Sequence, residues 1–235
     1  MTHRKAEVPV ALMPGLSLAA IYARLLAAYG PQGWWPLHGF AGSNPTTSGA
    51  GRGYHPGDYC FPRDAAERFE ICVGAILTQN TAWPNVERVL AALSAARLLS
   101  PAAILAHPLD EMARLIRPSG YFNGKARKLR ELAAFHGALG GRTPTRAQLL
   151  AVWGIGPETA DSIRLYAYGE TEMVVDAYTR RVLAGLRLAD ASIGYEALKV
   201  FCVRGLPAET AVYQEFHALI VEHAKRLRAA KGLSG

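Results

Sequence analysis

The sequence predicts an all-α fold. From residue 64 onward apolar residues recur at helical spacing, and capping or helix-breaking residues divide this pattern into segments. One run, Met173-Val174-Val175, looks strand-like, and it is too short to start a sheet. The 235 residues, 50% of them hydrophobic and 19% charged, are enough to bury a core, which excludes an extensively disordered or fibrous chain.

The predicted helices follow one another with short breaks. The first covers residues 16–29 and stops at Gly30-Pro31, and the second begins at residue 64 and breaks near residues 81–84. Further helices are expected over residues 85–98, 101–106, 109–116, 125–136, 145–153, 157–168, 179–186, 195–205 and 208–230.

A long loop separates the first two helices. Residues 30–62 are rich in Gly, Pro, Ser, Thr and aromatic residues, and loops of this length are usually functional or disordered. The flanks at residues 34–36 and 59–61 are too apolar to be left in water. We therefore expect the flanks to pack and the Gly/Ser-rich centre to move.

A helix-hairpin-helix motif is predicted where Gly154-Ile155-Gly156 separates two helices. The glycines permit backbone torsions and close approaches that other residues do not, and Pro157 suits the first position of the second helix. The open amides of that helix can bind one backbone phosphate of DNA. The alternative is an ordinary turn between helices, because G-x-G before a helix is common.

Asp176 follows the apolar run at residues 173–175, twenty residues after Gly156, and precedes a new helix. On its own it could simply cap that helix. Taken together, the G-I-G hairpin, the spacing and the V-V-D sequence resemble the endonuclease III superfamily of helix-hairpin-helix DNA glycosylases.

The resemblance covers roughly residues 64–230. The AILTQNT segment at residues 75–81 resembles the family's helix end with a duplex-probing glutamine, here Gln79, although Gln79 and Asn80 could also just cap the helix. The RPSGYFNGKARKL segment at residues 117–129 resembles the family's glycine-tyrosine-lysine turn. Together with Trp34-Trp35-Pro36 and the segment from Phe216-His217 through Lys225, these are most similar to the 3-methyladenine DNA glycosylase III branch, which lacks an iron-sulfur cluster.

Two departures from the parent family limit the chemistry. Glu158 stands where the family's lyases carry a nucleophilic lysine, and a carboxylate cannot form a Schiff base. No cysteine follows Cys202, so the family's cluster of four cysteines cannot be built. The resemblance therefore implies a monofunctional glycosylase with no lyase activity, no metal and no cofactor.

The resemblance also implies the roles in the site. Ionised Asp176 would stabilise positive charge on the sugar and orient or deprotonate the attacking water. A flipped, cationic alkylated purine would need little acid catalysis and would stack on electron-rich rings. The residues expected around that base are Trp34, Trp35, Pro36, Trp83 and Lys225. Core packing is the alternative for each aromatic residue.

Charge supports a DNA partner. The formal net charge is +7, and residues 112–130 hold six basic residues and no acidic one, with a second basic cluster at residues 225–231. Both runs could instead be ordinary solvated helix faces. Phosphate contacts are expected from Gly154, Gly156, Glu158, Thr159, Lys125 and Lys128. We expect a monomer that binds damaged double-stranded DNA, with a monovalent cation plausible on the hairpin carbonyls when DNA is bound.

The resemblance implies two lobes around a cleft that holds the flipped base, with Asp176 at the crossing point. Residues 1–63 would form the N-terminal helix and aromatic loop of the terminal lobe, residues 64–171 a central six-helix domain, and residues 172–235 the helices that complete the terminal lobe. No signal peptide or membrane span is predicted, and the three scattered cysteines fit a reducing compartment, so we expect a cytoplasmic protein, nucleoid-associated if bacterial.

Two other functions stay open. One is a monofunctional glycosylase for mispaired or oxidised bases, which would need more hydrogen-bond partners for a neutral base than tryptophans supply. The other is a non-catalytic helix-hairpin-helix module that binds DNA and uses Asp176 only as a cap.

Overall fold

The computed structural model describes residues 9–46, 52–230 and 232. All regular secondary structure within these residues is helical, which confirms the predicted fold class. The helices are α1 (Leu18–Tyr29), α2 (Ala65–Leu77), α3 (Trp83–Ala95), α4 (Pro101–Ala106), α5 (Leu109–Leu115), the 3₁₀ turn η1 (Arg117–Ser119), α6 (Phe122–Leu139), α7 (Arg146–Leu150), α8 (Pro157–Ser162), the π-helical turn η2 (Ile163–Ala167), α9 (Ala177–Gly185), α10 (Tyr195–Gly205) and α11 (Thr210–Ala230). None of these described helices is both long and apolar enough to span a membrane.

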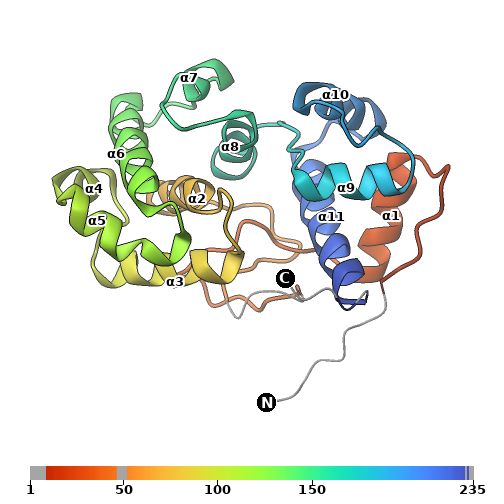
Figure 1. Cartoon of the computed structure of the whole chain (residues 1–235), viewed down its shortest axis with the longest axis horizontal. Helices are drawn as coiled ribbons and strands as arrows, with labels where there is room; N and C mark the ends of the chain where they lie inside the picture. Colours follow the sequence, from red (N-terminus) through yellow and green to blue (C-terminus); the bar gives the residue numbers. More distant parts are fainter. Residues whose placement is uncertain (1–8, 47–51, 231, 233–235) are drawn as a thin grey trace, which may run out of the picture.

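The helices form two groups that lie side by side (Figure 1). Helices α2 to α8 make one group, and α1, α9, α10 and α11 make the other. Although α1 and α11 come from opposite ends of the chain, they pack against each other, and α11 also packs on α9. The turn η2 contacts α2, α8 and α11, so it joins the two groups.

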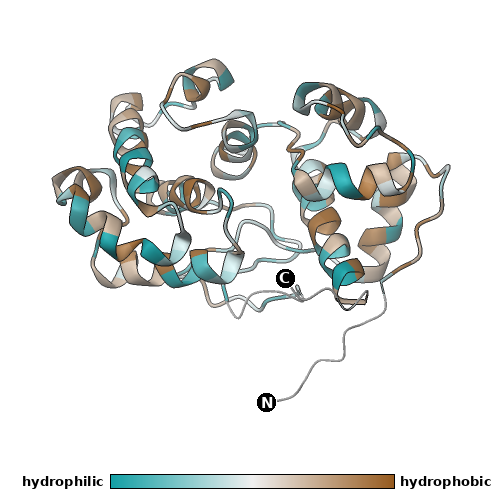
Figure 2. Ribbon diagram, viewed as in Figure 1, coloured by the Kyte–Doolittle hydropathy of each residue, from teal (hydrophilic) through white to brown (hydrophobic). Residues whose placement is uncertain are grey.

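Helix α2 is the centre of its group. Its residues from Ile71 to Leu77 are all buried, and it packs against α3, α6, α8 and η2. Figure 2 shows mostly apolar residues on α2, whereas α6 alternates between hydrophilic and hydrophobic residues. A helix that is apolar all round needs neighbours on every side, which explains why the shorter helices surround it.

Side-chain caps fix where several helices begin. The hydroxyl of Ser17 accepts a hydrogen bond from the amide of Ala20, and the carboxylate of Asp64 accepts one from the amide of Glu67. Thr145 forms a reciprocal capping box with Gln148 at the start of α7. The predicted start at residue 16 was therefore two residues early.

Other predicted boundaries also need correction. The helix predicted over residues 85–98 begins at Trp83 and ends at Ala95, because Arg97 adopts a left-handed conformation. The helix predicted over residues 125–136 extends to 122–139, and the one predicted over 145–153 ends at Leu150. The strand-like residues 173–175 are buried and extended but do not pair with a strand among the described residues.

The long loop folds back on itself. The amide of Leu37 donates to the carbonyl of Gly53, and the amide of His55 donates to the carbonyl of Gly33. The first flank packs as expected, since Trp35 is buried, but in the second flank only Phe61 is buried, while Tyr59 and Cys60 are exposed. The part of the expected mobile centre at residues 47–51 lies outside the described residues.

A buried ion cluster links the two groups of helices. The carboxylate of Asp161 in α8 is fully buried and accepts from Arg146 Nε at 2.7 Å, from Lys199 Nζ at 2.8 Å and from the hydroxyl of Tyr195 at 2.8 Å. Arg146 begins α7, whereas Tyr195 and Lys199 lie on α10 in the other group. Asp161 therefore fastens the hairpin to α10.

We expect Asp161→Asn to destabilise the protein by about 3 kcal/mol, because removing one partner of a buried ionic cluster leaves the other charges uncompensated. Urea unfolding measures this change. The matched control is Asp110→Asn, which removes an exposed pair with Arg114 and should change stability by less than about 0.5 kcal/mol. Equal effects of the two substitutions would contradict the role given to Asp161.

Candidate functional site

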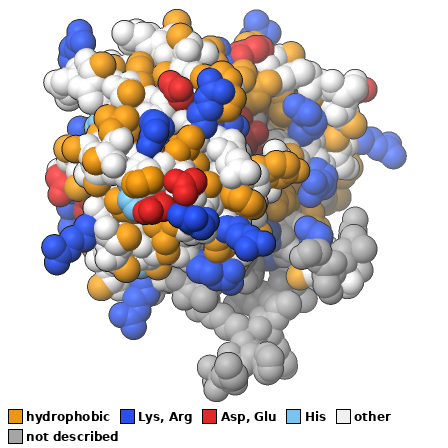
Figure 3. Space-filling model, turned by 60° about the vertical axis from the view of Figure 1, so that its left-hand side comes forward, with side chains coloured by type: hydrophobic (Ala, Val, Ile, Leu, Met, Phe, Trp, Pro, Cys, Tyr) orange, Lys and Arg blue, Asp and Glu red, His pale blue; other side chains and the backbone are white. Residues whose placement is uncertain are grey.

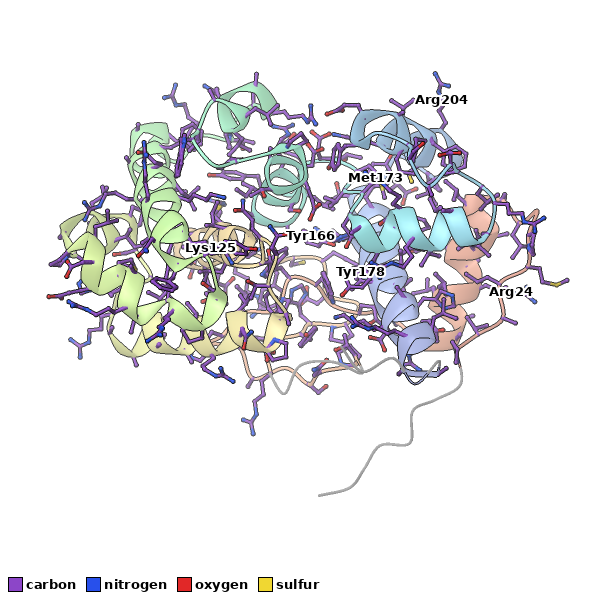
Figure 4. All side chains as sticks on the ribbon, in the orientation of Figure 1. Arg24, Lys125, Tyr166, Met173, Tyr178 and Arg204 are labelled. Carbon is purple, nitrogen blue, oxygen red and sulfur yellow. The ribbon has the colours of Figure 1, made fainter. Side chains whose placement is uncertain are left out.

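The candidate site lies where the two groups of helices meet. The N-terminus of α9 brings Asp176, the middle of α11 brings His217, η2 brings Tyr166, and the long loop brings Trp34. Figure 4 shows Tyr166 at this junction, and Tyr178 from the first turn of α9 beside it in the view.

Asp176 caps α9. Its Oδ1 accepts from the amide of Thr179 at 2.7 Å and from the hydroxyl of Thr179 at 2.9 Å. The helix-capping role that the sequence left open for Asp176 is therefore observed, but it uses only one carboxylate oxygen. Oδ2 lies 3.7 Å from Nε2 of His217, and 13% of the Asp176 side chain stays exposed.

The pKa of Asp176 reflects opposing effects. Burial alone would raise it, but the nearby His217 and the two hydrogen bonds from Thr179 outweigh burial, so the pKa lies below its ordinary value. Asp176 is therefore ionised at neutral pH.

His217 and Tyr166 were missed as site residues by sequence reasoning. Nδ1 of His217 lies 2.8 Å from the hydroxyl of Tyr166, and both side chains are buried. Within a helix, an isolated His or Tyr on an apolar face looks like core. The unusual π-helical geometry around Tyr166, which often marks functional sites, is not visible in the sequence.

Trp34 forms one wall of the site. Its ring meets His217 edge-on with a centroid distance of 5.5 Å, and Nζ of Lys225 lies 5.9 Å from the Trp34 ring centroid. The buried carboxylate of Glu215 fixes the preceding backbone, since it accepts from the amide of Gln32 at 2.9 Å and from that of Gly33 at 3.4 Å. Of the predicted base-binding residues, Trp34 and Lys225 are thus brought together near Asp176.

The other predicted base-binding residues lie elsewhere. Trp35 is only 6% exposed and packs edge-on against Trp83 and Tyr166, so it has no face open to a base, and its predicted stacking role does not fit this geometry. Pro36 and Trp83 instead line a small cavity of about 60 Å³. The remaining residues around that cavity are Leu37, His38, Arg52, Glu87 and Leu90.

The hairpin is locked onto the end of α2 by Gln79. Its amide nitrogen donates to the carbonyl of Gly154 at 3.1 Å and to the hydroxyl of Thr159 at 3.0 Å, while its amide oxygen accepts from Nζ of Lys128 at 2.6 Å. Gln79 therefore contacts both Lys128 and Thr159 before any DNA is bound.

Glu158 is exposed on the first turn of α8, next to the site. Partial desolvation and the negative charge of Asp176 raise its pKa. Gly156 caps α8 without a side-chain acceptor, which leaves the amides of this turn uncapped by any side chain.

The predicted phosphate contact by Lys125 does not fit the structure. Lys125 is 2% exposed, and its ammonium donates to the carbonyl of Leu77 at 2.8 Å, the hydroxyl of Thr81 at 2.9 Å and the carbonyl of Ser119 at 2.7 Å. These contacts use all three of its N–H donors. Burial, with a smaller effect from Lys128, lowers the pKa of Lys125 to about 8.

Lys125 instead ties the loop after α2 to the turn before α6, and Figure 4 shows it between these two helices. Tyr121 in that turn has a positive φ of 46° and is 75% exposed, the highest value among the exposed large hydrophobic side chains of the described residues. Tyr121, an exposed aromatic side chain on this turn, is a third residue that sequence reasoning did not single out, after His217 and Tyr166.

A family comparison decides the class of protein. The model of the HhH-GPD superfamily of base excision DNA repair proteins matches residues 73–207, more than half of the chain. The chain belongs to this superfamily. The matched segment includes the hairpin and Asp176, and the chain is therefore a DNA glycosylase of the HhH-GPD type, as its resemblance to the endonuclease III superfamily implied.

Individual relatives agree with this assignment. A Methanocaldococcus jannaschii protein provisionally named a DNA repair glycosylase is 38% identical over 224 residues, which cover 91% of this chain and 89% of that protein. A thymine-DNA glycosylase of Aeropyrum pernix is 33% identical over 130 residues, covering 54% of this chain and 58% of that protein. The structure of 3-methyladenine DNA glycosylase from H. pylori bound to 1,N6-ethenoadenine superposes with a TM-score of 0.61 at 30% identity, covering 68% of this chain and 85% of that one.

Only some of the basic side chains at residues 112–130 of this HhH-GPD protein are exposed without a short contact to another part of the protein. Arg114 pairs with Asp110 at 3.0 Å, and Arg130 donates to the carbonyl of His107 at 2.6 Å. Arg127 is exposed and lies 4.1 Å above the ring of exposed Trp153, beside the hairpin. Figure 3 shows Lys and Arg side chains spread over this side of the molecule with apolar side chains between them.

Metal and cation sites stay predictions. Among the described residues no group of three His, Cys, Asp or Glu side chains could hold a metal ion. The chain has three cysteines, Cys60 in the loop, Cys72 in α2 and Cys202 in α10, fewer than the four thiolates of a cluster. One hairpin carbonyl, that of Gly154, already accepts from Gln79, so a monovalent cation would need the others.

Alanine at the two hairpin glycines should have different effects. Gly154 has a φ of +88°, and a Cβ there would lie 2.5 Å from Cγ of Lys128, so Gly154→Ala should cost more than about 1 kcal/mol of stability and displace Lys128 from Gln79. Gly156 has a φ of −94° and no heavy atom within 4 Å of a Cβ, so Gly156→Ala should stay within about 0.5 kcal/mol. Chemical denaturation compares the two, and equal stabilities would contradict the lock between hairpin and Gln79.

Proposed function

We propose that this protein is a monofunctional DNA glycosylase that hydrolyses the N-glycosidic bond of alkylated, positively charged purines in duplex DNA. The observation that carries the proposal is the ionised Asp176 carboxylate at the junction, beside the indole of Trp34 and without an amine at the position of Glu158.

Asp176 would act on the sugar. As the C1′–N bond breaks, its electron pair leaves with the base and positive charge develops on the sugar ring. A fixed, ionised carboxylate in a poorly solvated site stabilises that charge strongly, because no solvent must reorganise when it appears. Water then adds to C1′ and loses a proton, for which Asp176 is the nearby base. The alkylated base leaves as a neutral molecule, so no acid is needed to protonate it.

Trp34 would select a cationic base over a neutral one. A cationic ring on an indole gains roughly 0.5–2 kcal/mol by the cation–π interaction, and a neutral base gains less. Lys225 shares this ring, and as a cation it would compete with the base. Burial lowers the pKa of Lys225, against the opposing effects of the charges of Glu222, Asp176 and Glu87.

The absence of lyase activity would follow from Glu158. Schiff-base formation at C1′ needs an unprotonated amine, and the hairpin offers a carboxylate at the corresponding position. The product would be an intact strand with an abasic site.

Recognition of duplex DNA would use the edge formed by the hairpin and the loop after α2. The uncapped turn of α8 suits a phosphate, and Arg127 and Lys128 flank it. The exposed Tyr121 would face the duplex and stack at the gap left by the flipped nucleotide, and Gln79 would pair with the orphaned base by exchanging its contacts with Gly154, Thr159 and Lys128. We propose that the protein acts as a monomer in the cytoplasm and needs no cofactor.

A second candidate is a glycosylase for mispaired neutral bases. The relative named thymine-DNA glycosylase favours it.

A panel of duplexes separates the candidates. Single-turnover assays with methylated, ethenoadenine, uracil, thymine-mismatch and oxidised-base duplexes should show release of alkylated purines fastest, with no strand cleavage and no product trapped by borohydride. Asp176→Asn should slow release by about 10²–10⁴-fold while leaving DNA affinity nearly unchanged. Release of neutral mispaired bases alone would support the second candidate, and an adduct trapped by borohydride would contradict the monofunctional assignment.

The stacking role of Trp34 has its own test. Trp34→Ala should reduce release of 3-methyladenine by about tenfold or more and leave binding to undamaged DNA unchanged, because a cation–π contact of up to about 2 kcal/mol is lost. Trp34→Phe keeps an aromatic ring and should recover part of the rate. Equal losses in base release and in binding of undamaged DNA would make Trp34 a structural residue.

A further inference from the structure

We infer that His217, held in place by Tyr166, is a positioning residue that orients the Asp176 carboxylate from the side opposite Thr179. This inference rests on the proposed function for the role of Asp176, but the geometry that carries it belongs to the folded protein itself.

The carboxylate is held at both oxygens. Thr179 occupies Oδ1 with two hydrogen bonds, and Nε2 of His217 lies 3.7 Å from Oδ2. This second distance is longer than a hydrogen bond, so the contact is electrostatic in the free protein and would shorten when a substrate excludes water. With one oxygen fixed by its own helix and the other facing His217, the carboxylate has little freedom to rotate.

Tyr166 fixes which nitrogen of His217 carries the proton. The Tyr166 hydroxyl lies 2.8 Å from Nδ1 of His217 and 3.2 Å from the carbonyl of Gln214. If the hydroxyl donates to Nδ1, the proton of a neutral imidazole must lie on Nε2. If it donates to Gln214, Nδ1–H donates to the hydroxyl oxygen, and a neutral imidazole would turn a lone pair on Nε2 toward the Asp176 carboxylate. The first arrangement avoids that repulsion and directs an N–H toward Asp176.

Two other elements contact the imidazole ring of His217, which lies in the middle of α11. The rings of Trp34 and His217 are nearly perpendicular at 88°, and Tyr166 comes from η2. Any movement of the Trp34 wall would therefore be transmitted to the imidazole, which couples the surface proposed for the base to the carboxylate proposed for the sugar.

Several charged or titratable groups surround this pair. Glu158 on α8 interacts with both Asp176 and His217, and Arg180 on α9 interacts with Glu158. Lys225 on α11 interacts with Asp176, and Glu215 on α11 interacts with Tyr166. A substitution of His217 therefore removes one of the groups that act on Asp176 and leaves the others in place. The titration of Asp176 measures the effect of that loss directly.

The same helix supplies a matched control. His223, six residues further along α11, is also buried and places Nδ1 2.9 Å from the hydroxyl of Tyr29. That pair contacts the amide of Val10 through Tyr29 instead of the Asp176 carboxylate. A substitution of His223 therefore removes a buried histidine that contacts a tyrosine hydroxyl, but it removes no partner of Asp176.

The test is a carboxyl-carbon NMR titration of ¹³C-labelled protein, with the Asp176 resonance assigned from its absence in Asp176→Asn. His217→Leu removes the N–H and should shift the midpoint for Asp176 upward by about one pH unit, a tenfold change in its proton affinity. His217→Gln retains an N–H donor and should restore part of the shift, and Tyr166→Phe should give a smaller shift in the same direction. His223→Leu and Tyr29→Phe should leave the Asp176 midpoint unchanged.

Base release by the same variants gives the second measurement. The acidic limb of the pH–rate profile should move upward in His217→Leu by the same amount, because activity needs ionised Asp176 and is lost as the pH falls through its pKa. On that limb, below the Asp176 midpoint, the single-turnover rate should fall by about tenfold, whereas at pH 6, where Asp176 is ionised in both proteins, the shift alone should leave the rate nearly unchanged. The double variant with Tyr166→Phe should lose no more than His217→Leu alone, as expected of residues that act as one unit.

An Asp176 midpoint in His217→Leu equal to that of the wild type, or a similar shift in His223→Leu, would overturn the positioning role. Failure of the proposed function is a separate result. It would appear as wild-type protein that releases no base from any damaged duplex, while the titration would still decide the relation between His217 and Asp176.

Discussion

A carboxylate that stays ionised in a poorly solvated junction is the constraint on which the site depends. Burial opposes the charge of Asp176, and the Thr179 hydrogen bonds together with His217 more than offset that opposition. Those partners come from α9 and α11, and Tyr166 on η2 fixes the imidazole of His217. The Asp176 carboxylate therefore stays ionised only when the two groups of helices pack in this arrangement. The π-helical turn and the capped start of α9 serve the same carboxylate.

The surrounding structure holds this junction with buried polar contacts rather than with apolar packing alone. Asp161 fastens the hairpin to α10, and Glu215 fixes the backbone before Trp34. Gln79 locks the hairpin onto α2, and Lys125 ties the neighbouring loop to the turn that carries Tyr121. Buried groups of this kind have few alternative partners, and they therefore specify one relative arrangement of the helices. A preorganised arrangement is what electrostatic stabilisation of a charged sugar requires.

The sequence predicted what depends on local pattern or on a motif. Helical periodicity and caps gave the all-α class and the order of helices, and the hairpin with Asp176 gave the superfamily. It could not separate Trp34 from Trp35, because adjacent aromatics have the same apolar character and only the packing of Trp35 against Trp83 and Tyr166 shows that it is core. Lys125 was misassigned for a similar reason, since a lysine within a basic run looks solvated, and its three acceptors come from two other stretches of the chain, the end of α2 with the loop after it and the turn η1.

The measurement that tests the central claim most directly is the affinity of the protein for duplex DNA with a cationic pyrrolidine in place of the sugar at the target position, compared with a neutral tetrahydrofuran. If Asp176 stabilises positive charge on the sugar, the wild type should bind the pyrrolidine duplex at least about 10²-fold more tightly, and Asp176→Asn should lose that preference. Equal affinities of the wild type for the two duplexes, or a preference that persists in Asp176→Asn, would contradict the account.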